Sequence, residues 1–294
     1  MIGLLASVQY PQNPGGVMVF GWVDGQAELR RDAGLVRRLR PRPADSDLLD
    51  LASNDYLGLA RHPETVEGAV AAARSWGGGA TGARLVTGTT ELHTRLEREL
   101  ARFTGFEAAL VLSSGYAANL AAVTALAPHG SLIVSDAGNH ASLIDGCRLA
   151  RGTTQVAAHA DPDAVRKALR THGGPALVVS DAVFSVDGDA APVRELARAC
   201  RESGAGLLLD DAHGLGVLGE GGRGVPWAAG LAGAGDVVVT VTLSKSLGSQ
   251  GGAVLGPARV IDHLVNTART FIFDTGLAPA AVARAGGARP AAAR

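Results

Sequence analysis

Lys245 is the residue of this chain whose type and position most suggest covalent chemistry. Lysine is rare here, since Lys167 and Lys245 are the only two. Lys245 follows the β-branched run 237–242 and precedes a glycine-rich turn. Partial burial at the end of a strand lowers the pKa of an ammonium group and frees the amine as a nucleophile that can form a Schiff base. The segment taken alone is equally compatible with a surface lysine in a polar loop.

Asp210 and His213 follow another apolar run, residues 206–209. A carboxylate that leaves a buried strand stays ionised only beside a cationic partner, and a protonated heterocyclic nitrogen would serve. His213 lies close enough in sequence to reach the same ligand. The pair could also be metal ligands, but no third ligand stands at a matching spacing. We therefore expect no metal site.

Further polar groups follow other predicted strands. Residues 113–116 can form an anion site at the start of a helix, although the segment could be an ordinary strand-to-helix turn. His140 opens the next helix and could be only a capping neighbour, and Ser185 could be only a turn residue. Together these groups supply an amine, an acid, two imidazoles, a hydroxyl and an anion cradle. Pyridoxal 5′-phosphate (PLP), a planar anionic aldehyde, would use every one of them.

The composition describes an ordinary globular protein. The 294 residues carry a net charge of −1, with 47% hydrophobic and 19% charged residues. This balance gives no excess of positive charge that would indicate binding to nucleic acid or to an anionic membrane. The N-terminal segment lacks the basic region of a signal peptide, and no apolar run approaches the roughly 20 residues that span a bilayer. We expect a cytoplasmic protein with two buried, unreactive cysteines, Cys147 and Cys200.

The elements that must position these groups are read from hydrophobic periodicity. We expect a basic amphipathic helix over 28–40, a short strand and turn over 49–59, and helices over 61–76 and 90–103. Beyond Phe106, apolar runs at 108–114, 131–136, 154–159, 175–181, 206–211 and 236–242 alternate with helical patterns. Continuous apolar strands separated by helices predict an α/β fold, with a mostly parallel sheet covered on both faces. Ligands of such sheets bind at the carboxyl ends of the strands.

Several segments, in order along the chain, resemble the signatures of the α-oxoamine synthases, a family of fold-type I PLP enzymes of the class-II aminotransferase type. They are SNDYLGL, GGGATGARLVTGT, SSGYAAN, NHASLIDG, FSVDGDAAPV, DDAHGLGVLGEGGRG and TLSKSLGSQGG. The resemblance extends from about Arg30 to Ala283. It implies a PLP-binding large domain with a mostly parallel seven-stranded sheet flanked by helices, and a homodimer.

The resemblance also implies roles for single residues. Lys245 would hold PLP and later act as the base, and Asp210 would pair with the ring nitrogen. His140 would stack on the ring, while Ser185 and His213 would hydrogen-bond near the ring oxygen. The phosphate and the substrate are assigned to further residues. These are Gly115, Tyr116 and Thr242 for the phosphate region, and Arg37, Asn54 and His140 for the substrate.

The implied reaction is a decarboxylative condensation of L-alanine with a pimeloyl thioester of CoA or acyl carrier protein, as in the biotin-pathway branch of the family. Glycine C-acetyltransferase, which uses glycine and acetyl-CoA, is the alternative within the family. The alternative from a different class of function is an inactive remnant of such an enzyme that still binds PLP. A nucleotide-binding module is disfavoured because no G-x-G-x-x-G follows the first strand of a βαβ unit.

The expected organisation has four parts. Residues 1–27 are expected to form a tail without regular structure, in which Met18 is a second candidate start, and 28–60 a helical arm with a short strand. Residues 61–278 would form the PLP-binding domain. The alanine-rich residues 279–294 show no apolar periodicity and are expected to be an irregular tail. They stand where the family has a C-terminal domain, so we expect that domain to be truncated.

Overall fold

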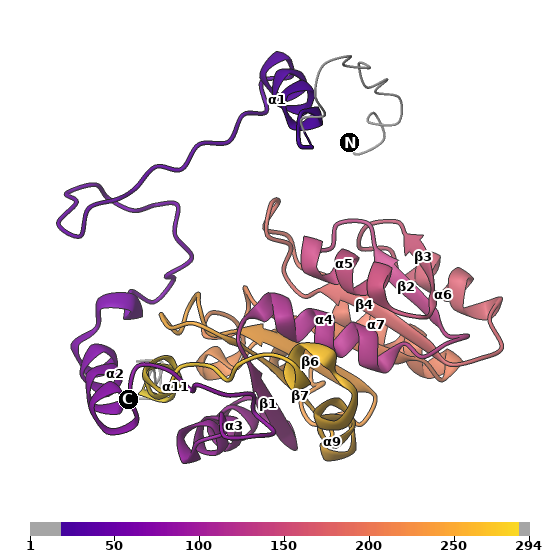
Figure 1. Ribbon diagram of the computed structural model, residues 1–294. Helices are drawn as coiled ribbons and strands as arrows, with labels where there is room; N and C mark the ends of the chain where they lie inside the picture. Colours follow the sequence, from indigo (N-terminus) through magenta and orange to yellow (C-terminus); the bar gives the residue numbers. More distant parts are fainter. Residues whose placement is uncertain (1–18, 288–294) are drawn as a thin grey trace. The chain divides into compact units, whose positions relative to one another are not determined.

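The computed structural model describes residues 19–287 and divides the chain into two units, Met1–Leu51 and Ala52–Arg294 (Figure 1). In the first unit, helix α1 spans Trp22–Asp32, so the expected helix over 28–40 is wrong in both bounds. The expected tail over 1–27 is also wrong for the residues that α1 includes, whereas 1–18 lie outside the described residues. The helix ends where Gly34 adopts φ 68° and the Leu35 N–H donates to the Arg30 carbonyl at 2.8 Å. This glycine-dependent turn overrides the amphipathic pattern that continues beyond it.

The expected strand over 49–59 does not form. In the second unit, turns lead from Ala52 into a short 3₁₀ helix, η1, at Leu59–Arg61. The Asp55 carboxylate accepts the Ala60 N–H at 3.1 Å, and Gly58 has φ 65°. A side chain that bonds its own backbone, followed by a left-handed glycine, favours a turn over an extended strand.

Within the described residues, seven strands form one sheet in the order β1-β7-β6-β5-β4-β2-β3, with β1 at one end and β3 at the other (Figure 1). The strands are β1 Ala108–Leu112, β2 Leu132–Asp136, β3 Thr153–Ala157, β4 Ala176–Asp181, β5 Gly206–Asp210, β6 Val237–Thr242 and β7 Gly252–Gly256. The five strands from β6 to β3 are parallel, and β7 runs antiparallel to both β1 and β6. The mostly parallel seven-stranded sheet is confirmed.

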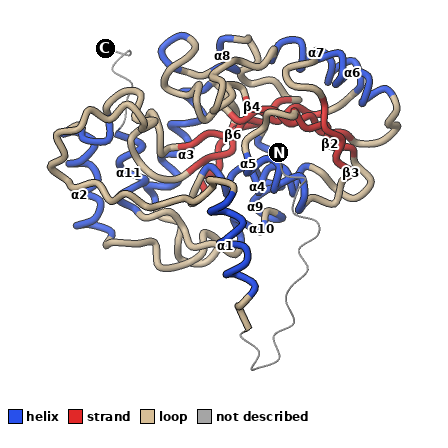
Figure 2. Tube along the Cα trace, turned by 90° about the horizontal axis from the view of Figure 1, so that it is seen from above, coloured by secondary structure: helices blue, strands red, loops and turns tan. Residues whose placement is uncertain are grey.

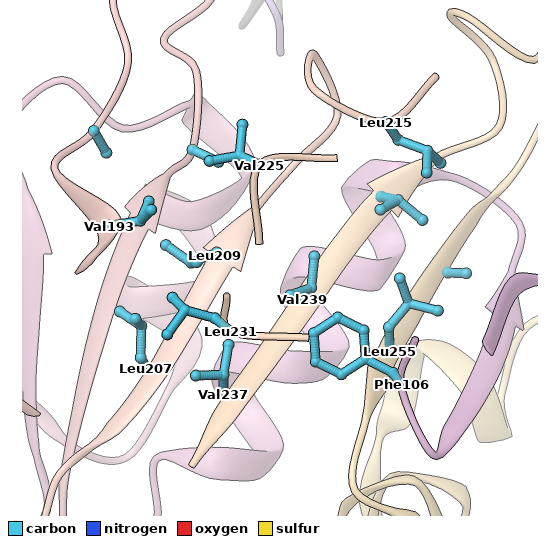
Figure 3. Packing of buried hydrophobic residues seen from close by; sticks show 14 of the residues in the cluster. Phe106, Val193, Leu207, Leu209, Leu215, Val225, Leu231, Val237, Val239 and Leu255 are labelled. Atoms are coloured by element: carbon cyan, nitrogen blue, oxygen red, sulfur yellow. The ribbon is translucent and has the colours of Figure 1, made fainter. Parts of the chain in front are cut away.

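Helices cover both faces of this sheet (Figure 2). One face packs against α4 Gly115–Leu126, α5 Ala141–Leu149, α9 Ala258–Thr267 and α10 Arg269–Ile272. The other face packs against α3 Glu91–Thr104, α6 Pro162–Arg170, α7 Val193–Ser203 and the short α8 Val225–Ala228. Side chains alternate between the faces along each strand. Leu207 and Leu209 lie on one face (Figure 3), whereas Leu208 belongs to the cluster on the other. Burial on both faces explains why the inner strands are continuous apolar runs, whereas β3, at the end of the sheet, is largely exposed.

Helices α2 and α11 pack together beside the sheet. Helix α2, Pro63–Trp76, confirms the helix expected there, which ends at Gly77. Helix α11 spans Pro279–Gly287 and buries Val282 and Ala285. The expectation of an irregular tail from residue 279 is therefore wrong for 279–287, because alanine favours helix even where apolar periodicity is weak. Residues 288–294 lie outside the described residues, and the four domain boundaries stay predictions.

Candidate active site

A cavity of about 210 Å³ lies at the carboxyl ends of the parallel strands. Three of these strands contribute where the chain leaves the sheet: β4 through Asp181, β5 through Asp210, and β6 through the turn that carries Lys245. Most of the predicted site residues line it. They are Gly115, Tyr116, His140, Asp210, His213, Thr242 and Lys245. The sheet topology thus brings together groups that lie up to 130 residues apart in the sequence.

Lys245 and His213 contact each other in this cavity. Lys245 Nζ lies 2.8 Å from His213 Nε2. The Tyr56 hydroxyl donates to Asn54 Oδ1 at 3.1 Å and lies 2.6 Å from His213 Nδ1. Because the single Tyr56 hydroxyl proton is directed at Asn54 Oδ1, the tyrosine oxygen accepts a hydrogen bond from His213 Nδ1–H. His213 Nε2 therefore carries the lone pair and accepts a hydrogen bond from the Lys245 amine.

Burial shifts the pKa values of both groups toward their neutral forms. Loss of hydration lowers the pKa of Lys245 below its usual value, while the nearby carboxylates of Asp210 and Asp181 oppose that shift. Loss of hydration also lowers the pKa of His213, and the positive charge of Lys245 lowers it further. A lysine with a lowered pKa, beside a neutral imidazole, is suited to nucleophilic and basic chemistry.

Asp210 is held in place by two donors. Asn119 Nδ2 donates to its Oδ2 at 2.6 Å, and the Ala212 N–H donates to its Oδ1 at 3.0 Å. The residue is 8% exposed and still lines the cavity. The carboxylate can therefore accept one more hydrogen bond from a ligand without losing its supports.

Asp181 is a second buried carboxyl group of the cavity. Its Oδ1 accepts the His140 N–H at 3.3 Å. Burial, reinforced by the negative charge of Asp210, raises the pKa of Asp181 to about 8. The raised pKa favours the protonated form of Asp181, and in that form it can donate a hydrogen bond into the cavity.

The N-terminus of α4 forms the end of the cavity nearest Thr242. Ser114 caps the helix, its hydroxyl accepting the Ala117 N–H at 3.0 Å. A Cβ atom added to Gly115 would lie 3.1 Å from the Cβ of Thr242, so a larger residue here would crowd the space between them. Thr242 and Ser244 join their hydroxyls at 2.7 Å on the facing side. Free backbone N–H groups and hydroxyls in this arrangement are suited to a phosphate.

The remaining predicted residues lie elsewhere. Ser185 is exposed in the loop after β4 and is not among the residues that line the cavity. Asn54 is exposed and is connected to the cavity through Tyr56. Arg37 belongs to the first unit, Met1–Leu51. The functional roles of these three residues stay predictions.

Sequence reasoning missed Asn119, Ser142, Asp181 and Tyr56. Asp181 ends β4 as Asp210 ends β5, so the strand-end argument used for Asp210 could have found it. Asn119 is a polar residue in an otherwise apolar stretch of α4, which is a usable signal. Tyr56 carries no such signal, because only the fold brings it to His213.

The donor set of the cavity fits PLP. A buried amine suits its aldehyde, a supported carboxylate suits its ring nitrogen, and the start of α4 suits its phosphate. Among residues 19–287, no group of three or more histidine, cysteine, aspartate or glutamate side chains could hold a metal ion. No helix in that part of the chain is long and apolar enough to cross a membrane. Both cysteines are buried and free, as expected.

Comparison with known proteins places the chain in a family. Residues 46–289 match the model of the aminotransferase class I and II family. The chain belongs to this family. Its members depend on PLP, so the protein is an enzyme of a PLP-dependent family.

Individual relatives agree with the α-oxoamine synthase resemblance. The 8-amino-7-oxononanoate synthase of Mycobacterium sp. (strain KMS) is 60% identical over 271 residues, which are 92% of this chain and 71% of the relative. The serine palmitoyltransferase of Sphingomonas wittichii has a similar structure, with a TM-score of 0.83, 32% identity, and coverage of 92% of this chain and 71% of that one. A further solved structure, SPT with PLP internal aldimine, has a TM-score of 0.84 and 30% identity, covering 93% of this chain and 72% of its own.

Proposed function

We propose that this protein is an 8-amino-7-oxononanoate synthase, which binds PLP and condenses L-alanine with a pimeloyl thioester. The observation that carries the proposal is the contact of the Lys245 amine with His213 in a cavity that also holds Asp210. The high identity to curated relatives of that name supports the choice within the family.

Lys245, Asp210 and the start of α4 would hold the cofactor. The Lys245 amine would bind the aldehyde carbon, Asp210 the ring nitrogen, and the backbone at Gly115 the phosphate. Bound PLP would supply a ring that withdraws electrons and so stabilises negative charge at the Cα of the amino acid. Because Asp210 already accepts from Asn119 and Ala212, its carboxylate is positioned before the ring arrives.

Lys245 is suited to take the proton from the Cα of L-alanine. Its lowered pKa favours the unprotonated amine, and His213 Nε2 accepts a hydrogen bond from that amine and so orients it. The lowered pKa of His213 favours its neutral imidazole, so the Nε2 lone pair is available to accept from the Lys245 amine. General bases of this kind work best when their pKa lies near the operating pH.

The acyl half of the reaction is assigned by analogy to the curated relatives. Attack of the deprotonated alanine Cα on the pimeloyl thioester would form a carbon–carbon bond as the carbon–sulfur bond breaks and the thiol leaves. Loss of the alanine carboxylate as CO2, followed by return of a proton to Cα, would give the amino ketone. Asn54 and Arg37 are proposed to contact the substrates. The thioester carrier, CoA or acyl carrier protein, is left open.

The decisive experiment incubates the purified protein with PLP, L-alanine and pimeloyl-CoA, and measures CO2 release and the keto-amine product by mass spectrometry. Parallel reactions with pimeloyl-acyl carrier protein, and with glycine and acetyl-CoA, distinguish the carrier and the alternative family reaction. Product from glycine and acetyl-CoA alone would replace this proposal with glycine C-acetyltransferase. PLP binding without any product would identify an inactive PLP-binding remnant.

We also propose a homodimer. Large apolar side chains stand exposed in the second unit, among them Leu57, Tyr116, Val217 and Leu218, each about two-fifths exposed, and Tyr116 lines the cavity. Exposed apolar groups gathered on one region mark interaction surfaces. Light scattering during size-exclusion chromatography tests this proposal, and a mass of 29.8 kDa for the particle would contradict it.

A further inference from the structure

Asn119 connects three elements beneath the cavity. It lies in α4 and is 2% exposed. Its Nδ2 donates to Asp210 Oδ2 at 2.6 Å and to Ser142 Oγ at 2.8 Å, and its Oδ1 accepts from Thr240 Oγ1 at 2.5 Å. Asp210 ends β5, Ser142 lies in α5 and Thr240 in β6. Both N–H donors and the oxygen of one amide are therefore directed at site elements or their neighbours.

The directions of these hydrogen bonds follow from the chemistry of the groups. The carboxylate of Asp210 acts as an acceptor, as it does toward the Ala212 N–H. The donating amide nitrogen of Asn119, and not its oxygen, must therefore face it. The Thr240 hydroxyl donates to the amide oxygen, which leaves the second N–H of Asn119 for the Ser142 oxygen. The orientation of the Asn119 amide is thus determined by partners on both sides.

Ser142 passes this orientation on to His140. Its hydroxyl oxygen accepts from Asn119, so its proton is free to donate to His140 Nδ1, which lies 2.7 Å away. The Ser142 N–H also donates to that nitrogen, at 3.2 Å. A ring nitrogen that accepts two hydrogen bonds carries no proton, so a neutral His140 carries its proton on Nε2. Two donors of Ser142, its backbone N–H and its hydroxyl, therefore set the tautomer of His140, and the hydroxyl connects it through Asn119 to Asp210.

We propose that Asn119 is a positioning residue that couples Asp210 to His140, with Ser142 as the intermediate. It supports the ionised form of Asp210 with a charge-assisted hydrogen bond, and through Ser142 it keeps His140 in the Nε2–H tautomer. A purely structural Asn119 would only join α4 to the sheet and would leave the tautomer of His140 unaffected. The consequences for PLP rest on the proposed function, whereas the tautomer does not.

The test compares Asn119→Leu, which keeps the approximate size but removes all three hydrogen bonds, with Ser142→Ala, which removes only the branch to His140. Nitrogen-15 NMR of the cofactor-free full chain reports the tautomer of His140. Titration with PLP, followed by its visible absorbance, reports affinity. Far-ultraviolet circular dichroism and thermal unfolding check that each variant folds.

Asn119→Leu is expected to weaken PLP binding by roughly 10- to 100-fold, the loss that follows removal of a hydrogen bond to a charged group. Ser142→Ala is expected to weaken it by less than about fivefold, because the bond from Asn119 to Asp210 remains. Both variants should raise the fraction of the Nδ1–H tautomer of His140, although the Ser142 N–H still donates to Nδ1 in each and keeps Nε2–H the major form. The Ser142→Ala result stands on its own if Asn119→Leu does not fold.

An unchanged His140 tautomer in Ser142→Ala would overturn the coupling. PLP affinity within about twofold of wild type in a folded Asn119→Leu would overturn the support of Asp210. If the wild-type protein itself fails to bind PLP, the proposed function fails, and the tautomer measurements still decide whether Asn119 and Ser142 orient His140.

Discussion

The cavity around Lys245 and the cluster around Arg84 both bury charged or titratable side chains within Ala52–Arg294, but they satisfy them differently. Arg84 donates to Thr89, to Glu97 and to the Val111 carbonyl at 2.8–2.9 Å, using all three nitrogens. Its positive charge also lies over the ring of Phe271, 5.3 Å from the centroid. In the cavity, by contrast, Lys245 has a neutral imidazole as its near neighbour, and Asp210 keeps accepting capacity that faces open space.

His93 belongs with the first kind of region. It is fully buried, its Nε2 donates to the Leu277 carbonyl at 3.0 Å, and its Nδ1 accepts the Thr90 N–H at 3.2 Å. Both ring nitrogens are thereby used within the protein. The comparison shows two uses of buried polar groups. Those whose hydrogen-bonding groups are paired within the protein stabilise the fold, whereas those that keep unpaired donors or acceptors beside a cavity can bind a ligand.

The largest expected effect comes from Lys245→Ala. Product formation and the visible absorbance of the lysine-bound cofactor should both be lost, because no other amine lies in the cavity among the described residues. The free energy of unfolding should change by less than about 1 kcal/mol, since the substitution also removes a buried amine. Lys167→Ala, at the exposed second lysine, is the matched control and should retain the absorbance. A Lys245→Ala protein that keeps the absorbance would remove this residue from the site.

Arg84→Met should destabilise the fold, because it removes the side chain that donates to Thr89, Glu97 and the Val111 carbonyl. The substitution leaves the largely buried carboxylate of Glu97 without its cation, which destabilises a protein by about 3–5 kcal/mol. Chemical denaturation measures the effect. Arg95→Met is the control, because Arg95 pairs with Glu99 on the same helix but is exposed, and such pairs are worth less than about 1 kcal/mol. Equal losses in the two variants would contradict the distinction.

His93 should make stability depend on pH. Burial, and then the positive charge of Arg84, lowers the pKa of His93 to about 4, whereas the unfolded chain titrates near 6.5. The unfolded state therefore binds more protons between these values, and stability is complete above pH 6.5 and falls as the pH drops toward 4, by about 3 kcal/mol.

Denaturation at several pH values checks this dependence. His93→Gln, which can still donate to Leu277, should flatten the profile across that window. His129→Gln, at an exposed histidine, should leave it unchanged. A wild-type profile that is flat between pH 6.5 and 4 would show that His93 is not held neutral.

Ser185→Ala should have the smallest effect. Ser185 is exposed and outside the cavity, so a hydrogen bond from it to the ring oxygen of PLP would be a solvent-accessible, neutral one. We expect a loss of PLP affinity of roughly threefold, as for a weak hydrogen bond. A tenfold or larger loss in the PLP titration would show that the loop after β4 closes onto the cofactor.

Much of the sheet and part of the site were predictable from residue types. The apolar runs predicted six of the strands, because most of these strands are buried on both faces and need apolar residues at every position, whereas β3, at the end of the sheet, is largely exposed. The seventh, β7, has glycine at both ends and carries a weaker signal. The extent of α1 was missed because a single glycine in a left-handed conformation outweighs an amphipathic pattern. Helix α11 was missed because its apolar side is made mostly of alanine.

The sequence by itself determined which chemistry this protein can contain: a rare lysine and an aspartate, each directly after a buried strand, and a small-residue turn that opens a helix. Parallel strands must end at the same edge of their sheet, so these groups could be expected to meet. Only the tertiary structure decided which polar groups are saturated and which remain free. It brought Tyr56 to His213 and Asn119 to Asp210, and it buried Asp181 beside a second carboxylate. Hydrogen-bond partners and loss of hydration depend on contacts between distant segments, and local sequence patterns do not contain that information.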